Sequence, residues 1–244
     1  MRRFEKDREI WENLAKTDAL WSILTKPETK GNKWEIDAFF KTGEEYASKV
    51  FSTLKGMNIP INYEGTVLDF GCGVGRLTVP LAKRFKKAIG VDISPTMISK
   101  AKAYHGDLKN CSFIVNEADN FKIFSDNSFS MIFSILTLQH IEKKHALKYI
   151  KEFIRITKPG GLIHFQLPVP QPTAFKDLKV FIRDYLVSFR NIFSKSKEYP
   201  MHHYGVEEEA VANVLKSGCE IFEIDRSSPL TGYEYDRRYN AIKR

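Results

Sequence analysis

The residues with the clearest chemical meaning surround a short run of glycines, residues 71–75, called the glycine loop below. Asp69 stands two positions before Gly71, and Gly73 and Gly75 follow at alternate positions. Between a strand and a helix, glycines let backbone N–H groups meet a ligand with no Cβ in the way. The dinucleotide-binding version of such a loop, G-x-G-x-x-G, binds a pyrophosphate. Asp69 would repel a pyrophosphate, so this loop favours a ligand with a positive charge nearby.

Two further acids follow the next two predicted strands. Asp92 comes about twenty residues after the glycine loop, where a carboxylate can accept hydrogen bonds from both ribose hydroxyls. Asp119 can accept from an adenine amino group, and the backbone at Asn120 can address a ring nitrogen. S-adenosylmethionine (SAM) carries an ammonium, a ribose and an adenine, and it has no phosphate. The three acids therefore favour SAM over a nicotinamide dinucleotide as the cofactor, with S-adenosylhomocysteine (SAH) as the product.

Alternating strands and helices must position these residues. Short apolar runs predict strands, and three- or four-residue apolar spacing predicts helices between them. The predicted strands are 66–70, 88–92, 112–115, 129–134, 162–167, 220–225 and 233–242. The predicted helices are 77–85, 95–104, 144–156, which Pro159 and the following glycines stop, and 207–216. This order predicts an α/β fold, a parallel sheet with helices on both faces.

Two segments fall outside this alternation. Residues 1–60 have helical spacing interrupted near Pro27 and Gly31, and they are predicted to form an N-terminal helical cap. Residues 61–244 are predicted to form the cofactor-binding domain, with an insertion at 168–205. Within it, residues 173–197 have an apolar face at helical spacing and a net charge of 6 − 2 = +4. This stretch is interpreted as a lid over the acceptor, with a dimer contact or a peripheral membrane contact as alternatives.

These residues together resemble the class I, Rossmann-like SAM-dependent methyltransferases of bacteria. The likeness spans roughly residues 64–167. It rests on Asp69-x-Gly-x-Gly-x-Gly75, Gly90-Val-Asp92-Ile-Ser, Glu117-Ala-Asp119, Phe129-Ser-Met-Ile-Phe-Ser134 and Lys158-Pro-Gly-Gly161. The resemblance implies a seven-stranded sheet in the order 3-2-1-4-5-7-6 with strand 7 antiparallel. The chain departs from the family at Ser130, a structural position where the family usually has Asp.

The resemblance also implies roles for single residues. It assigns Asp92 to the ribose, and Asp119 with Asn120 to the adenine. Its full cofactor set is Asp69, Gly71, Cys72, Gly73, Gly75, Asp92, Ile93, Met97, Asp119, Asn120, Ser134 and Ile135, where Ile93 and Met97 lie near the adenosine and Ser134 and Ile135 near the methionine chain. The N-terminal aromatics Trp34 and Phe39 resemble more weakly a methyltransferase type that acts on sugars or small metabolites. They are predicted to form a wall of the acceptor pocket, with ordinary packing as the alternative.

Histidines supply the candidates for a catalytic base. His140 comes just after the predicted strand 129–134, where the family's acceptor atom lies, and it can remove a proton from a hydroxyl. Its neighbour Gln139 would line the same pocket, and the alternative role of His140 is packing or capping. His202, His203 and Tyr204 follow the insertion and can line the acceptor pocket; His203 and Tyr204 are weaker candidates for the base. Adjacent histidines point in different directions, so no metal site is predicted.

Bulk composition limits the remaining classes of function. The 244 residues carry a formal net charge of +8, which leaves an RNA methyltransferase as an alternative, although the charge forms no single block. No Asn/Asp-Pro-Pro-Tyr tetrapeptide, typical of nucleic-acid amino methylators, follows the strand 129–134. The three cysteines have no paired spacing. No signal peptide or transmembrane run is found, so the protein is expected in the cytoplasm, as a monomer or homodimer.

The leading functional prediction is methylation of a hydroxyl, or alternatively an amine, of a small molecule or sugar. The alternatives are an RNA methyltransferase and a non-catalytic SAM-binding protein. A nicotinamide-dependent dehydrogenase is a more distant alternative.

Overall fold

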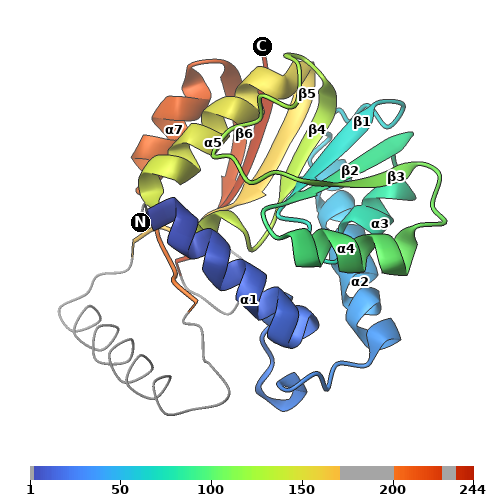
Figure 1. Cartoon of the computed structure of the whole chain (residues 1–244). Helices are drawn as coiled ribbons and strands as arrows, with labels where there is room; N and C mark the ends of the chain where they lie inside the picture. The colour runs from blue at the N-terminus through green and yellow to red at the C-terminus, as the bar shows by residue number, and fades with distance from the viewer. Residues whose placement is uncertain (1–2, 171–200, 227–234) are drawn as a thin grey trace.

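A single seven-stranded sheet organises the molecule (Figure 1). The computed structural model describes residues 3–170, 201–226 and 235–244. The strand order is β3-β2-β1-β4-β5-β7-β6, and β7 runs antiparallel to both of its neighbours, so the predicted fold is confirmed. The strands are β1 Thr66–Phe70, β2 Lys87–Asp92, β3 Cys111–Val115, β4 Phe129–Ser134, β5 Thr157–Gln166, β6 Cys219–Asp225 and β7 Arg238–Lys243.

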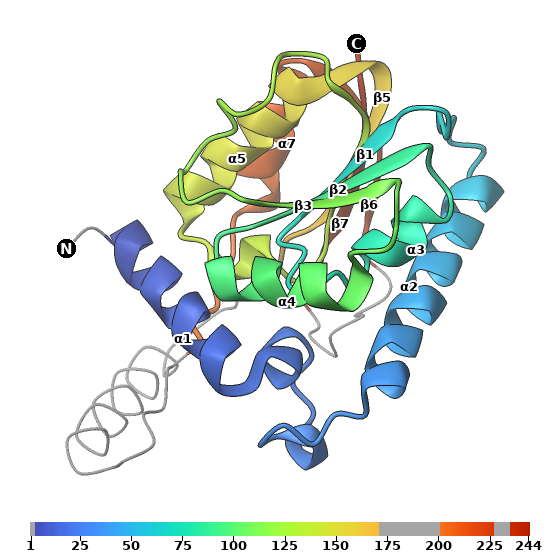
Figure 2. The same cartoon turned by 45° about the vertical axis from the view of Figure 1, so that its right-hand side comes forward.

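Helices cover both faces of the sheet, and β1 shows how the sequence divides them. Successive side chains of a strand point to opposite faces. Leu68 and Phe70 join the cluster formed with α5 (Lys143–Ile156), whereas Val67 joins the cluster formed with α2 (Ile36–Gly56) and α3 (Thr78–Ala82). Figure 2 shows α2, α3 and α4 on one side of the sheet and α5 and α7 on the other. The helix bounds are α2 Ile36–Gly56, α3 Thr78–Ala82, α4 Pro95–His105, α5 Lys143–Ile156 and α7 Glu208–Lys216.

Several element bounds differ from the sequence prediction. The helix predicted over 77–85 is shorter, because α3 spans only Thr78–Ala82. Helix α5 ends at Ile156, and the segment with Pro159 and its glycines belongs to β5, which pairs with β4 across an irregular register. Strand β7 begins at Arg238 rather than at residue 233. The basic stretch 173–197, with its three interpretations, lies outside the described residues.

The N-terminal segment forms a helix, a turn and a second helix. Helix α1 spans Arg3–Ile23 and bends at Asp18, whose backbone is extended (φ −157°, ψ 78°). The Asp18 carboxylate accepts hydrogen bonds from the backbone N–H groups of Gly31 (2.6 Å) and Asn32 (2.9 Å). It therefore ties the bend to the turn that follows the 3-10 segment Pro27–Thr29, where Pro and Gly predicted an interruption.

Helix α1 is held against α4 by one carboxylate. Glu12 accepts hydrogen bonds from the Ser94 hydroxyl (2.6 Å), the Thr96 hydroxyl (2.5 Å) and the Thr96 backbone N–H (3.1 Å). These groups form the N-terminus of α4, where Ser94 itself caps the Met97 N–H. Burial opposes the charged form of Glu12, but the hydrogen bonds outweigh it and lower its pKa to about 2. Figures 1 and 2 show α1 running below the sheet, from the N-terminal end of α5 toward α4.

Among the helices of the described residues, none combines the length and apolar character that crossing a membrane requires.

Candidate cofactor and acceptor site

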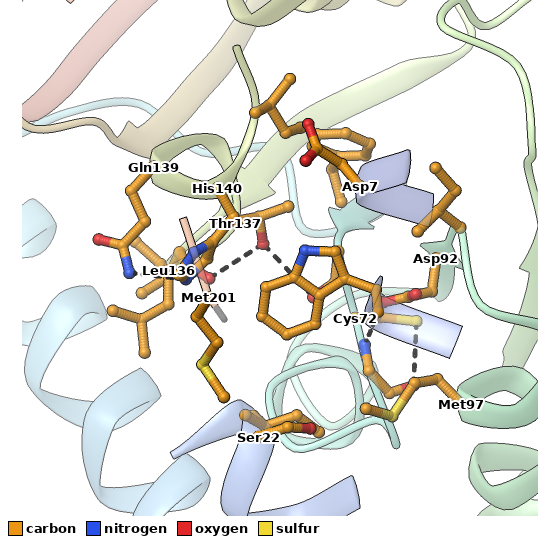
Figure 3. Close-up of a pocket in the computed structure, with 18 of the residues that line it drawn as sticks. Asp7, Ser22, Cys72, Asp92, Met97, Leu136, Thr137, Gln139, His140 and Met201 are labelled. Carbon is orange, nitrogen blue, oxygen red and sulfur yellow. Dashed lines mark hydrogen bonds between the residues drawn. The ribbon is translucent and has the colours of Figure 1, made fainter. Parts of the chain in front are cut away.

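One cavity of about 470 Å³ lies where α1 meets the carboxyl ends of the strands (Figure 3). Its floor comes from the ends of β1, β2 and β4 and from the glycine loop, the place where open α/β sheets bind ligands. Its other walls come from α1 with the following turn, and from Met201 and His203. Figure 3 shows Asp92, Cys72 and Met97 on one side of the cavity and Gln139, His140 and Met201 on the other.

The glycine loop adopts a backbone conformation that favours glycine. Gly71, Gly73 and Gly75 all have positive φ, and Gly71 and Gly73 line the cavity together with Cys72. A Cβ on Gly73 would lie 2.5 Å from the Cδ1 atom of Ile23, so α1 ends directly on the loop. Gly75 does not line the cavity. A Cβ there would lie 2.9 Å from the rings of His105 and Phe113, so its role is close packing.

Asp92 forms the polar centre of the floor. Its Oδ2 accepts from the Gly73 N–H (2.9 Å) and its Oδ1 from the Ser94 N–H (2.9 Å). Burial raises the pKa of this carboxyl, while those backbone N–H groups oppose the shift. Each carboxylate oxygen accepts more than one hydrogen bond, so both keep capacity for a ligand hydroxyl.

Asp69 is the second acid of the floor and is only 2% exposed. Its Oδ2 accepts from the Thr78 hydroxyl (2.6 Å). Burial raises the pKa of Asp69 to about 7, although the Thr78 hydrogen bond and the Arg76 guanidinium both lower it. A cationic ligand group beside Asp69 would offset this burial cost.

Besides Gly75, three further residues predicted to contact the cofactor are placed elsewhere. Ser134 is buried, and its hydroxyl donates to the Phe70 carbonyl (3.1 Å) between β4 and β1. Asp119 accepts from Lys148 Nζ (2.7 Å), which lowers its pKa, and neither Asp119 nor Asn120 lines the cavity. Asn116 lines it instead, and its side-chain amide donates to the Asn120 carbonyl (2.8 Å). Ile93, Met97 and Ile135 lie in the cavity wall.

The predicted aromatic wall is also corrected. Trp34 and Phe39 do not line the cavity, because they pack edge to face in an apolar cluster with Val74 and Met97. The Trp34 indole N–H donates to the Leu24 carbonyl (3.1 Å), which fixes the turn after α1. The aromatic residues of α1 that do line the cavity are Phe4 and Trp11.

His140 lies in the cavity wall but is arranged as a neutral structural residue. Its Nδ1 lies 2.8 Å from the His202 carbonyl, which can only accept, so Nδ1 carries the proton. Its Nε2 then accepts from the Gln139 side-chain amide (3.1 Å). Burial, reinforced by the nearby His203, lowers the pKa of His140 to about 3. A group with so low a pKa is a poor general base near neutral pH, which contradicts the predicted role.

The other predicted acceptor-side residues separate into two groups. His203 lines the cavity, with its ring centroid 4.6 Å from that of His140. His202 and Tyr204 do not line it. The His202 carbonyl holds His140, and the Tyr204 N–H donates to the Gln139 carbonyl (2.7 Å). The segment after the insertion is thus pinned to the residues that follow β4.

Gln139 lines the cavity and is fixed by a buried amide network. Its Oε1 accepts from Gln166 Nε2 (3.0 Å), which also donates to Asp236 Oδ1 (2.6 Å). Gln166 Oε1 accepts from the backbone N–H of Leu136 (2.8 Å), a residue with φ +62°. The network therefore holds the strained turn after β4 in one conformation.

Several residues that line the cavity were not predicted from the sequence, although the sequence positions of two of them pointed to the site. Arg76 directly follows the glycine loop, and Asn116 is the first polar residue after the strand β3. Trp11 gave no signal, because nothing in its local spacing indicates that α1 crosses the cavity. The edge of Trp11 meets the His140 ring, with 4.8 Å between the ring centroids.

The residues present fit SAM as a ligand. The glycine loop leaves a surface that a Cβ would fill, Asp92 has free acceptor capacity beside it, and Asp69 is a buried acid suited to an ammonium. The volume lies within the range of small-molecule sites. No group of three or more metal-ligating side chains occurs within the described ranges.

Comparison with known proteins supports the same family. Residues 67–161 match a family described as "Methyltransferase domain". A phosphoethanolamine N-methyltransferase from Arabidopsis thaliana is 32% identical over 102 residues, which are 41% of this chain and 21% of that protein. The chain therefore spans about a fifth of the length of that relative. A demethylmenaquinone methyltransferase from Staphylococcus saprophyticus is 28% identical over 193 residues, 77% of this chain and 79% of that protein.

A solved structure extends the likeness to the fold as a whole. Magnesium protoporphyrin IX methyltransferase from Synechocystis PCC 6803, crystallised with SAH, superposes with a TM-score of 0.63. It shares 18% identity and covers 97% of this chain and 98% of its own. Residues 67–161 thus match a methyltransferase domain, and the strand order of the sheet is that of the Rossmann-like methyltransferase fold.

Proposed function

We propose that this chain binds SAM and transfers its methyl group to a hydroxyl of a small molecule or sugar, an amine being the alternative acceptor. One observation carries the proposal. A single cavity is lined by the glycine loop, Asp69 and Asp92, and also by Gln139 and His203, so cofactor and acceptor groups would share one enclosed space.

The proposed mechanism needs positioning more than covalent chemistry. When bound, SAM supplies an electrophilic methyl group on a sulfonium, which a nucleophile takes by in-line displacement. Asp92 would bind the ribose hydroxyls, and Asp69 the ammonium. Trp11 and the rest of α1 would exclude water from the cavity. Alignment and desolvation of this kind supply much of the rate of such reactions.

A hydroxyl acceptor also needs a proton acceptor, and we propose His203 for that role. It lines the cavity beside His140, whose own ring nitrogens are engaged by His202 and Gln139. His140 would act as a positioning residue that holds the segment carrying His203. This assignment transfers the predicted base role from His140 to its neighbour in the cavity.

Small acceptors are favoured by the walls of the cavity. Helix α1 and Met201 form two of these walls and limit the cavity to about 470 Å³, a size that suits a small molecule. Both walls come from outside residues 67–161, which match the methyltransferase domain. The two relatives aligned by sequence are named for phosphoethanolamine and demethylmenaquinone, both small molecules. We also infer that residues 1–60 act as the cap of the site, through α1.

The test combines binding with product detection. Isothermal titration calorimetry with SAH is expected to show binding, and titration with NADH none. Asp92→Asn should weaken SAH binding, whereas Asp107→Asn, an exposed matched change, should leave it unaltered. Methyl-labelled SAM is then offered to the small-molecule fraction and to the RNA fraction of a cell extract.

Label in a small hydroxylated product supports the proposal. Label only in RNA would establish the RNA alternative, and SAH binding without transfer to either fraction would establish a non-catalytic SAM-binding protein. Binding of NADH without SAH would overturn the cofactor assignment.

A further inference from the structure

Arg76 is a buried cation in the cavity wall with no carboxylate partner. It is 5% exposed and lines the cavity directly after the glycine loop. Within the described residues its side chain donates one hydrogen bond, from Nη1 to the Thr42 hydroxyl at 3.4 Å, and its guanidinium lies 6.0 Å from the centre of the Tyr46 ring; its buried Nε has no hydrogen-bond partner. Among the described residues no carboxylate forms an ion pair with it. An arginine remains charged even when buried, so the unpaired charge is costly.

The other cations of the cavity wall are already engaged. Arg8 forms an ion pair with Glu117 at 2.9 Å. Lys26 lies 5.0 Å from the centre of the Trp34 ring, over its face. Lys26 is also exposed, so within the part of the chain that the structure describes, Arg76 is the cavity-lining Lys or Arg that is buried without an anionic partner.

Asp69 is the matching buried anion of the same wall. It is 2% exposed, and its recorded hydrogen bond comes from the Thr78 hydroxyl. Asp69 and Arg76 influence one another electrostatically but are not within ion-pair distance. A ligand that carries both an ammonium and a carboxylate would neutralise the two buried charges together, since each end finds its opposite.

We propose that Arg76 binds the carboxylate of the methionine portion of the cofactor while Asp69 binds its ammonium, so that the two residues form a receptor for a zwitterion. This inference rests on the proposed SAM-binding function. The planar guanidinium presents several N–H donors that match a carboxylate, which a lysine would not reproduce.

The experiment compares two ligands that differ only in the carboxylate. Calorimetry measures the Kd of SAH and of decarboxylated SAH for the wild-type protein, without acceptor. Wild type is expected to bind SAH roughly 30-fold or more tightly than the decarboxylated analogue, the size expected for a desolvated charge pair. Arg76→Gln should lose this preference by weakening SAH alone. Arg84→Gln, a matched change at an arginine that does not line the cavity, should keep it.

The outcomes separate this inference from the proposed function. If wild type binds neither ligand, the SAM-binding function fails. If Arg76→Gln binds SAH as tightly as wild type, or loses both ligands equally, the receptor role is wrong. If Arg76→Gln binds SAH as tightly as wild type but no longer binds an acceptor that carries a carboxylate, Arg76 belongs to the acceptor site, and the inference is also overturned. Melting temperature without ligand checks folding, and Arg76→Met, with a similar stem length and no charge, replaces Gln if that variant unfolds.

Discussion

Glu12 is the residue whose loss should release α1 from the cavity. It accepts three hydrogen bonds at the N-terminus of α4, from Ser94 and Thr96. Glu12→Gln keeps the shape of the side chain but removes its charge. Glu9→Gln is the matched control, because Glu9 is exposed on the same helix and its substitution removes the same charge.

The expected size follows from the contacts that are lost. A carboxylate that caps a helix N-terminus contributes about 0.5–2 kcal/mol, and hydrogen bonds to a charged group lie near the upper part of that range. We therefore expect Glu12→Gln to weaken the docking of α1 by about 1–2 kcal/mol. That change multiplies the undocked population by roughly 5- to 30-fold.

Hydrogen exchange of backbone amides measures this population directly. Protection of the α1 amides should fall by roughly 5- to 30-fold in Glu12→Gln, because undocking exposes them, while β1 and β4 amides keep their protection. The Kd of SAH should rise, since α1 lines the cavity. Glu9→Gln should match wild type in both measurements.

The pH dependence adds an independent check. The pKa of Glu12 is lowered from its ordinary value of 4.5 to about 2, so its stabilisation is complete above about pH 4.5 and is lost as the pH falls toward 2. The difference in protection between wild type and Glu12→Gln should therefore be smaller at pH 3 than at pH 6. Equal protection at pH 6, or a difference that does not narrow on acidification, would refute the reasoning.

Three further predictions concern the floor and the wall of the cavity. Because the pKa of Asp69 is about 7, SAH affinity should increase about tenfold for each unit by which the pH is raised toward 7, and it should level off above pH 7. Asp69→Asn should remove this pH dependence, which calorimetry at several pH values measures. His140→Ala should cost about 1–3 kcal/mol in urea unfolding through its lost buried hydrogen bond, yet leave the shape of the kcat/KM pH profile unchanged; loss of the acidic limb of that profile would restore the base role. Gly73→Ala should weaken SAH binding and lower stability by about 1–2 kcal/mol, because φ is +53° and Ile23 lies in the way; a variant with unchanged Kd and melting temperature would contradict the placement of α1.

Local patterns predicted the sheet well because each strand carries its own signal. The bounds of β1 and β4 match the prediction, and the glycine loop was placed between β1 and α3 from glycine spacing alone. The strand order came from the family resemblance. The Pro-Gly-Gly segment misled the prediction, since such residues typically end an element but here enter β5 beside an irregular register.

The walls of the cavity were less predictable because they depend on distant contacts. Glu12 and Thr96 are 84 residues apart, and no periodicity in either segment indicates that they meet. Asp119 follows β3 as an adenine-binding acid would, but Lys148 on α5 captures it. His140 has the position of a base, yet its burial against the His202 carbonyl is set by a segment far along the chain. In each case the residue type indicated a role, but the sequence did not indicate which distant residue it would contact.

The contact between α1 and α4 has a consequence for the order in which a new chain matures. Helix α1 leaves the ribosome before α4, because Thr96, which binds Glu12, is made 84 residues later. At synthesis rates of about 5–20 residues per second, α1 waits roughly 4–17 seconds before that surface exists. Throughout this interval Trp11 and Leu14 have no native neighbours from α4 or the sheet and are open to chaperones. Helix α1 is thus made before the surface on which it packs.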